Sequence, residues 1–305
     1  MRIEQREVLH QTKLLCSLLG YSRQAYYKII KAHGKSRFEA GFLLAEVNHI
    51  RSTQPCLGGR KLLYKLQGFM VSHAICMGRD AFFELLREEG LLVKKRRRKY
   101  PKTTFSFHRF HKYPNLISGF VATAPRQLWV SDITYIKLLD GFAYLSLVTD
   151  AYSRKIVGYD LCERLSARGC IAALKMAVKD NSYKQAGLIH HSDRGVQYCC
   201  NDYVGLLGRN HIGISMTQSG DPLENALAER VNGILKQELL QDRYDTYKQA
   251  RPLVGKAIGI YNNERPHSSV DMLTPDQAHQ LTGPLKKHWT NYNPFSKERK
   301  AVMDG

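Results

Sequence analysis

A succession of short, β-rich hydrophobic segments is the feature that most constrains the fold of this 305-residue chain. Three segments rich in β-branched and aromatic residues occupy 129–135, 142–149 and 155–161. The residues between them, Leu139-Asp140-Gly141 and Asp150-Ala151-Tyr152-Ser153, are typical of turns. Three strands joined in this way predict an antiparallel meander.

Helices and two further strands follow. The predicted elements are a helix over 166–178, a strand over 188–191, a helix over 202–207, a strand over 212–216, a long helix from about 222 to 240, and a helix from about 247 to 263. The order β-β-β-α-β-α-β-α-α is that of a ribonuclease-H-like α/β fold. We therefore expect a mixed five-stranded sheet with flanking helices.

The positive charge is concentrated ahead of this sheet. The chain has 46 Lys and Arg against 27 Asp and Glu, a formal net charge of +19. Residues 1–120 sum to +15, residues 121–280 to +1 and residues 281–305 to +3. A basic front part attached to a nearly neutral block favours nucleic-acid binding, and a basic surface kept for solubility is the alternative.

The front part is predicted to be helical throughout. Residues 1–34 predict a compact helix-turn-helix, in which Gly20 ends the first helix and Ser22 caps the second. The second helix carries side chains suited to DNA contact, and a plain helical hairpin is the alternative. These candidate DNA-binding residues are Arg23, Gln24 and Lys28.

A second helical DNA-binding domain is predicted over 35–94. It contains the candidate DNA contact Arg60 after two glycines, and Asp80 is expected to cap its last helix. A basic linker over 95–122 comes next, and six consecutive cations at its start suit a solvated linker or an arm that contacts DNA. These candidate DNA contacts are Lys94, Lys95, Arg96, Arg97, Arg98 and Lys99. A catalytic core is then predicted over 123–282 and a basic tail over 283–305.

Cysteine content and hydropathy exclude several classes. The seven cysteines are odd in number and contain no C-x-x-C pair, which argues against a disulfide framework and a cysteine-based zinc module. No segment approaches the roughly 18 apolar residues of a membrane span, and no apolar signal region begins the chain. We expect a soluble protein of a reducing cytoplasm.

Three acidic residues stand out by position. Asp132 lies in the apolar first strand, Asp193 directly follows the fourth strand, and Glu229 lies on the long helix with 35 residues between it and Asp193. Taken singly, they are explained as a turn residue, a cap or a solvated helix face. Together they predict carboxylates that converge and require cations, and such hard oxygen ligands suit Mg²⁺ or Mn²⁺. A pair of these ions is the usual device for in-line attack at phosphorus.

Five segments carry a family resemblance. They are Trp129-Val130-Ser131-Asp132-Ile133-Thr134-Tyr135, Asp150-Ala151-Tyr152-Ser153-Arg154-Lys155-Ile156-Val157-Gly158, His191-Ser192-Asp193-Arg194-Gly195-Val196-Gln197-Tyr198, Glu224-Asn225-Ala226-Leu227-Ala228-Glu229 and Tyr261-Asn262-Asn263-Glu264-Arg265-Pro266-His267. With the helical front part, the chain resembles the second open reading frame of insertion-sequence-three-type bacterial transposases over roughly 10–280. These belong to the D,D(35)E class shared with retroviral integrases.

The resemblance implies a catalytic and metal-binding triad of Asp132, Asp193 and Glu229. It also implies a dimer or larger synaptic complex on double-stranded DNA, and an upstream-frame protein that acts with this chain or is fused to it. One departure is Glu224-Asn225, where the family typically has Asp-Asn, so Glu224 competes as the third acid. Helical spacing favours Glu229, because Asn225 and Asn232 share its face and Glu224 lies 140° away at 100° per residue.

Other polar residues near these segments have two explanations each. Lys236 is predicted near the Glu229 face, as a DNA contact close to the scissile phosphate or as an ordinary solvated lysine. Arg194 and Gln197 are candidate contacts to the DNA backbone. Arg265 and His267 suit phosphate contact or a polar helix cap. Two further residues are predicted to be structural, Asp150 at the end of an edge strand and His190 in strand-end packing. The alternatives are a secondary role for Asp150 and an approach of His190 and His191 to a metal ion.

The leading hypothesis is a DNA transposase that hydrolyses the 3′ ends of a mobile DNA element and joins the freed 3′-hydroxyls to a second phosphodiester. Two other classes share some of these features. A structure-specific nuclease would share the carboxylates and perform hydrolysis only. A non-catalytic DNA-binding regulator would use the helical front part and retain the core as a relic.

Overall fold

The computed structural model describes residues 12, 14–18, 20, 22–93, 108–179, 187–218 and 222–288. The chain divides into two compact units, Met1–Lys94 and Lys95–Gly305, and the division falls at the start of the predicted linker. The predicted cation run 94–99 and most of the predicted tail 283–305 lie outside the described residues. Each unit is described by itself.

The first unit is built on one long helix, α2 (Arg23–Thr53). Ser22 is its N-cap, as predicted, and the Ser22 hydroxyl accepts a hydrogen bond from the Ala25 N–H at 3.1 Å. Gly20 before it has a φ of +70°, a backbone conformation that suits glycine. However, α2 continues unbroken for 31 residues, so the boundary predicted between residues 34 and 35 lies inside one helix.

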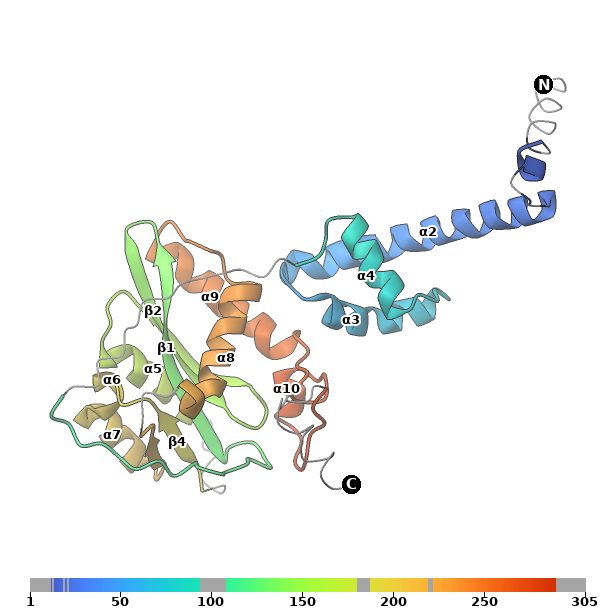
Figure 1. The fold of residues 1–305 in the computed structure, drawn as a ribbon. Coiled ribbons are helices and arrows are strands. Elements are labelled where there is room, and N and C mark those ends of the chain that lie inside the picture. The colour runs from blue at the N-terminus through green and yellow to red at the C-terminus, as the bar shows by residue number, and fades with distance from the viewer. Residues whose placement is uncertain are drawn as a thin grey trace, which may run out of the picture. The chain divides into compact units, whose positions relative to one another are not determined.

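Two shorter helices, α3 (Gly59–Ser72) and α4 (Arg79–Glu88), pack beside the C-terminal half of α2 (Figure 1). Their common core consists of fully buried apolar side chains that recur at helical spacing: Leu43, Val47, Leu62, Leu66, Phe82 and Leu86. The N-cap of α4 is Gly78, not Asp80 as predicted. Asp80 lies instead in the first turn of α4, where its carboxylate is paired with Arg79 at 2.8 Å.

The second unit contains the predicted five-stranded sheet. Its strands are β1 (Leu128–Leu138), β2 (Gly141–Asp150), β3 (Ile156–Cys162), β4 (Ile189–Ser192) and β5 (Gly213–Met216). They lie in the order β3-β2-β1-β4-β5. The β1–β2 and β2–β3 pairs are antiparallel, whereas the β1–β4 and β4–β5 pairs are parallel. The predicted meander is therefore confirmed, but β2 is an interior strand, and Asp150 does not end an edge strand as predicted.

Helices cover both faces of the sheet. On one face lie α5 (Ala167–Val178), α6 (Val196–Cys199) and α7 (Asn201–Arg209); on the other lie α8 (Ala226–Ile234) and α9 (Tyr247–Asn263) (Figure 1). Strand β2 serves both cores, because side chains alternate along a strand. Leu145 and Leu147 face α8 and α9, and Val148 faces α5. The short helix α10 (Pro275–Ala278) follows, begun by a capping box at Thr274.

The predicted long helix from 222 to 240 is divided into three segments. A 3₁₀ turn, η2 (Pro222–Asn225), precedes α8, and a π-helical segment, η3 (Leu235–Leu239), follows it. A π-helical segment breaks the 3.6-residue period of an α-helix, and such segments are frequent at functional sites. The prediction from regular spacing therefore holds only within α8.

Candidate active site

Two of the predicted carboxylates lie at the same place on the sheet. Strands β1 and β4 are parallel neighbours, and Val130 on β1 pairs with His191 on β4. Asp132 and Asp193 each come two residues later in their strands' direction, so their side chains leave neighbouring strands at one level. The position of Asp193 after β4 agrees with the prediction.

Asp132 is partly buried and is held by two hydrogen-bond donors. Its Oδ1 accepts from the Ile133 N–H at 2.8 Å and its Oδ2 accepts from the Asn232 amide at 2.7 Å. Burial, followed by the negative charge of Asp193, raises the pKa of Asp132 to about 7, with a smaller contribution from Glu229. The two hydrogen bonds act in the opposite direction. The chain thus places negative charges together where each one disfavours the ionisation of Asp132.

The loop after β4 orients Asp193. Its Oδ1 accepts from the Gly195 N–H at 3.0 Å. A Cβ atom at position 195 would lie only 3.0 Å from that same oxygen, so a side chain there would displace either the carboxylate or the backbone. Gly195 therefore permits the tight turn that returns an N–H to the carboxylate.

Helix α8 is fastened to β1 by two asparagines. The Asn225 amide donates to the Ser131 carbonyl at 3.0 Å, and the Asn232 amide donates to Asp132. Glu229 lies between them in the sequence, and within α8 it comes three residues before Asn232, on the same side of the helix. Partial burial raises the pKa of Glu229, although the residue as a whole is exposed.

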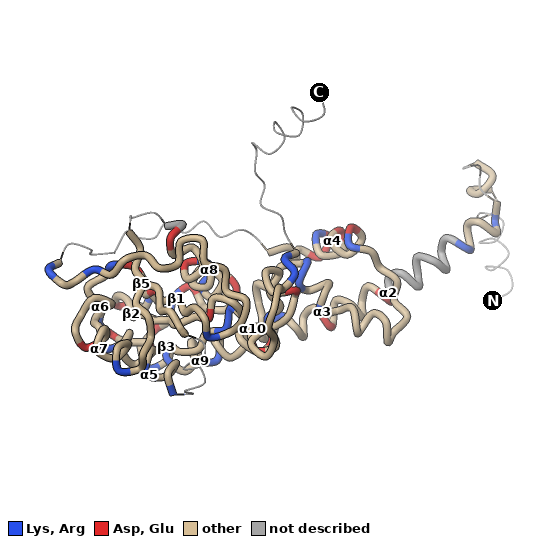
Figure 2. Tube along the Cα trace, turned by 90° about the horizontal axis from the view of Figure 1, so that it is seen from below, with Lys and Arg blue, Asp and Glu red and all other residues tan. Residues whose placement is uncertain are grey.

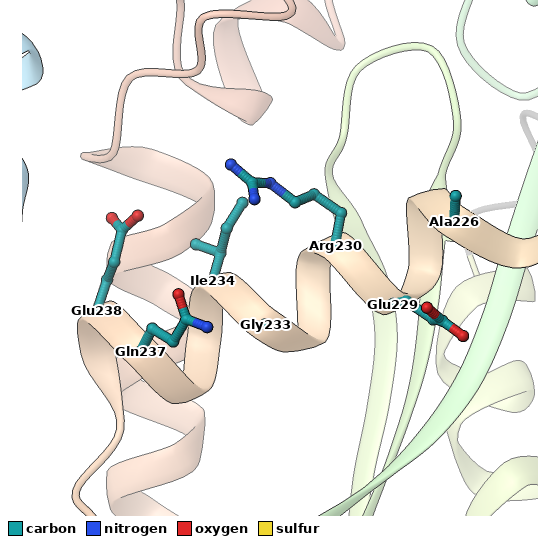
Figure 3. Close-up of a pocket in the computed structure, with 7 residues that line it drawn as sticks. All are labelled: Ala226, Glu229, Arg230, Gly233, Ile234, Gln237 and Glu238. Carbon is teal, nitrogen blue, oxygen red and sulfur yellow. The ribbon is translucent and has the colours of Figure 1, made fainter. Parts of the chain in front are cut away.

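Glu229 also lines a shallow groove of about 320 Å³ along α8 and η3 (Figure 3). Gly233 lies in the middle of this groove, and Arg230, Gln237 and Glu238 are among the residues around it. Figure 3 shows the Glu229 and Arg230 side chains pointing to different sides of the helix. The groove therefore presents a carboxylate and a guanidinium beside an open stretch of helix.

The competing acid, Glu224, is engaged elsewhere. Its Oε2 accepts from the Gln218 N–H at 2.7 Å, and its carbonyl oxygen lies 3.1 Å from His191 Nε2. Glu224 thus stabilises the segment that leads into α8. These contacts favour Glu229 over Glu224 as the third acid.

The donor chemistry of this site fits a divalent cation. Oxygen ligands suit Mg²⁺ or Mn²⁺, and a cation would add the positive charge that opposes the raised pKa of Asp132. Among the residues that the structure describes, no three His, Cys, Asp or Glu side chains are grouped closely enough to hold one metal ion. Asp132, Asp193 and Glu229 are candidate ligands because they are carboxylates that come from two neighbouring strands and the helix beside them.

The two histidines beside the aspartates are part of the packing. Burial and the neighbouring His191 lower the pKa of His190 to about 3, so its ring is neutral. His190 Nε2 lies 2.7 Å from Ser131 Oγ and 2.9 Å from the Tyr203 hydroxyl. This network agrees with the predicted packing role of His190. Tyr203, on α7, is a partner of His190 that no local sequence pattern predicts.

Asp150 organises the turn after β2. Its carboxylate accepts hydrogen bonds from Arg126, Tyr152 and Ser153, and it is completely buried. The Ser153 hydroxyl in turn lies 2.8 Å from His279 Nδ1. The predicted structural role agrees with these contacts, although the strand is interior.

Arg265, predicted as a phosphate contact or a polar helix cap, lies in a buried ion pair. Its side chain is only 2% exposed, and its guanidinium donates to both carboxylate oxygens of Glu238, at 2.8 and 2.7 Å. A third donor nitrogen faces the Pro266 carbonyl. Because these contacts occupy the guanidinium inside the protein, Arg265 cannot reach a phosphate in this structure. The sequence did not reveal Glu238, which lies 27 residues away and outside any regular spacing.

The remaining DNA candidates differ in exposure. Arg23, Gln24, Lys28 and Arg60 are exposed, and Arg194 is half-buried. Lys236 is only 7% exposed. The π-segment begins between Glu229 and Lys236, which removes the regular period that placed Lys236 near the Glu229 face. Its contact with DNA remains a prediction. His267 is also buried and packs edge-on against Tyr261 at 4.9 Å.

Family models match this unit over the segments that carry the site. One for an integrase core domain matches residues 122–222, and a second, also for an integrase core domain, matches residues 210–275. Similar proteins include the uncharacterized 31 kDa protein of insertion element IS600 from Shigella sonnei, at 35% identity over 88% of this chain and 99% of that protein. Transposase InsF for insertion sequence IS3A from Escherichia coli K12 is 33% identical over 63% of this chain and 67% of that protein.

Solved structures similar to this chain include the HTLV-2 integrase catalytic core domain in complex with magnesium. It is 21% identical, with a TM-score of 0.41, over 52% of this chain and 99% of that chain.

The sheet order and the two matched families define the class: this is a ribonuclease-H-like integrase core, and the chain is an enzyme of the DDE-type polynucleotidyl transferases. Dependence on a divalent metal is general in this class. With relatives of this similarity and coverage, the chain belongs to the IS3-type family of insertion-sequence transposases. No helix among the described residues is long and apolar enough to cross a membrane.

Proposed function

We propose that this transposase cleaves the 3′ ends of an insertion sequence and then transfers them to a second DNA. In the first step water attacks a phosphodiester, the phosphorus–oxygen bond to the 3′ end breaks, and a 3′-hydroxyl and a 5′-phosphate remain. In the second step that 3′-hydroxyl attacks another phosphodiester and displaces its 3′ oxygen. No covalent bond between protein and DNA is formed.

The observation that carries this proposal is the placement of Asp132 and Asp193 on neighbouring parallel strands, beside a helix that carries Glu229. Asp132 and Asp193 are close enough for one carboxylate to raise the pKa of the other. Asn232 ties the Glu229 helix to Asp132 at 2.7 Å. Carboxylates from two strands and a covering helix are the donors that phosphoryl transfer with metal ions requires.

We assign Asp132, Asp193 and Glu229 as ligands for Mg²⁺ or Mn²⁺, with two ions in the active site. Such ions, when bound, activate the attacking oxygen and stabilise the leaving oxygen. The Ile133 N–H and the Asn232 amide fix the orientation of Asp132, and the Gly195 N–H fixes that of Asp193. Glu229 completes the set when its exposed side chain turns toward the aspartates.

We further propose that the basic front part binds the terminal inverted repeats as double-stranded DNA. The net charge of +15 over residues 1–120 supports this role, since neutralised phosphates release counterions and strengthen binding. A homodimer or larger assembly would hold two ends together on the bacterial nucleoid in the cytoplasm. An upstream-frame protein, free or fused, would act with it.

Replacing Asp193 by Asn tests the catalytic assignment. We expect Asp193→Asn to retain binding to labelled end DNA and to abolish both 3′-end cleavage and the joining of supplied 3′-hydroxyl ends. Both are measured on gels with Mg²⁺ present, and Asp202→Asn in the first turn of α7 is the matched control. Joining by Asp193→Asn at the wild-type rate would show that the assignment is wrong.

A further inference from the structure

Helix α3 presents a stripe of side chains that its own unit does not cover. Arg60, Tyr64, Gln67 and Val71 are exposed, with Tyr64 at 40% and Val71 at 82%. At 100° per residue, these four positions fall within about 60° of one another on the helix. The buried side of α3 packs on the core of its unit and so fixes which side faces outward.

The chemistry of this stripe matches the edges of base pairs. An arginine pairs with guanine and a glutamine with adenine in the major groove, and a valine methyl packs on a thymine methyl. A tyrosine hydroxyl is a common donor to phosphate. Arg60, Gln67 and Val71 therefore provide one group for each kind of contact, along one side of one helix.

The charge of α3 also suits DNA. The helix contains Arg60, Lys61 and Lys65 and no acidic residue over its 14 residues. A helix without carboxylates can approach a row of phosphates without repulsion, and its cations release bound counterions. Both the shape of the stripe and the charge of the helix thus fit a DNA duplex.

The neighbouring helix α4 has the opposite character. Its 10 residues contain two arginines and three acids, and Figure 2 shows basic and acidic residues together on it. Both arginines are already paired within the helix, Arg79 with Asp80 at 2.8 Å and Arg87 with Glu84. An acidic helix with internally paired cations would be repelled by phosphates.

We propose that α3 is the helix that reads duplex DNA at the ends of the insertion sequence, through Arg60, Tyr64, Gln67 and Val71, and that α4 does not read bases. This inference rests on the proposed binding of the terminal repeats and adds the surface that performs it. It places the recognition on the first helix after α2, in the unit that precedes the catalytic core.

The test uses the full chain and two duplex probes of equal length. One covers an end of the insertion sequence that encodes this chain, and the other has the same composition in shuffled order. Fluorescence anisotropy at one fixed salt concentration gives both dissociation constants. We expect Gln67→Ala and Arg60→Ala to weaken binding to the end duplex by about 5- to 100-fold and to reduce the preference over the shuffled duplex.

Arg87→Ala on α4 is the matched control, since it removes the same charge as Arg60→Ala from an exposed helix position. We expect it to bind both duplexes within about twofold of the wild type. Circular dichroism shows whether each variant is folded. If an α3 variant is unfolded, Gln67→Glu replaces it, because the added carboxylate repels the phosphates at the same place on the helix.

The outcomes separate the two proposals. If the wild type prefers the end duplex and the α3 variants keep that preference while Arg87→Ala loses it, α4 is the reader and the inference is wrong. If the α3 variants and Arg87→Ala all keep the preference, the inference is equally wrong. If the wild type shows no preference for the end duplex, the proposed binding of the terminal repeats fails, whatever the variants do.

Discussion

At the scale of single residues, Asp132 connects stability to pH. A carboxyl group whose pKa is raised on folding, here from 3.8 to about 7, binds its proton more tightly in the folded chain than in the unfolded one. The free energy of unfolding of the metal-free protein therefore falls as the pH rises between these two values. Divalent ions should remove this dependence, because they bind the ionised form.

Asp132→Asn should remove this fall in the free energy of unfolding, because an amide does not ionise. The new amide can still accept from the Ile133 N–H, and it can donate to Asn232 if the Asn232 amide turns over. We expect the metal-free variant to melt a few degrees above the wild type at pH 8, at about 2–4 °C per kcal/mol. Thermal melts in EDTA across the pH range measure this. Asp140→Asn, at an exposed turn, is the control, and a lower melting temperature for Asp132→Asn would contradict the assignment.

Asn232→Ala should impair catalysis by making the Asp132 carboxylate easier to protonate. Its amide lowers the pKa of Asp132, so its loss raises that pKa and leaves more Asp132 protonated near neutral pH. We expect strand transfer to fall about 10-fold, with a higher Mg²⁺ requirement and a rate profile shifted to higher pH. Asn210→Ala, at the C-cap of α7, is the control, and an unshifted pH profile would argue against a positioning role.

Sequence reasoning placed the site only in part. The strand ends and helix spacing predict that Asp132, Asp193 and Glu229 converge, because the residue types and order of the elements restrict where carboxylates can meet; their catalytic role stays a prediction. It could not pair Arg265 with Glu238, since nothing local relates residues separated by a loop and a helix. An arginine next to a helix end looks the same in sequence whether it faces a phosphate or a buried carboxylate.

At the scale of elements, the buried ion pair of Glu238 and Arg265 connects the π-helical segment η3 to the end of α9. Glu238 lies in η3, and Arg265 follows the end of α9, so the pair joins two helices on one face of the sheet. Glu238→Ala leaves the Arg265 charge buried without its carboxylate and should cost about 3–5 kcal/mol of unfolding free energy. Chemical denaturation measures it, with the exposed neighbour variant Gln237→Ala as control.

The double variant Glu238→Leu with Arg265→Met distinguishes the charge from the packing. Because it removes both ions together, we expect it to recover most of the loss. A double variant as unstable as Glu238→Ala would mean that shape, and not an uncompensated charge, dominates at this place.

Element prediction succeeded where capping and period are regular. Helix α9 begins after the Thr246 cap and ends at Asn263, within the predicted bounds. Helix α2 runs through the predicted boundary between residues 34 and 35, although Gly34 and Ser36 beside that boundary are weak helix formers. The π-helical segment η3 is not predicted, because spacing arguments assume 3.6 residues per turn throughout.

At the scale of the whole molecule, most of the net charge lies ahead of the catalytic core in the sequence, with +15 over residues 1–120 and +1 over residues 121–280. Replacing the six cations at 94–99 by glutamine should make the dependence of DNA affinity on salt less steep, by about 5 in log–log slope if each neutralises one phosphate. Anisotropy titrations over a series of KCl concentrations measure that slope. Lys175→Gln with Lys179→Gln, at the end of α5, is the control and should leave the slope unchanged.

The unbroken length of α2 bears on the DNA as well as on the protein. Its 31 residues rise about 46 Å, the length of about 14 base pairs, or more than one turn of the double helix. For a duplex contacted at both ends of α2, that rod would fix both the spacing and the phase of the two contacts. The distance between sequence blocks within a terminal repeat would then be selected as strictly as the bases themselves.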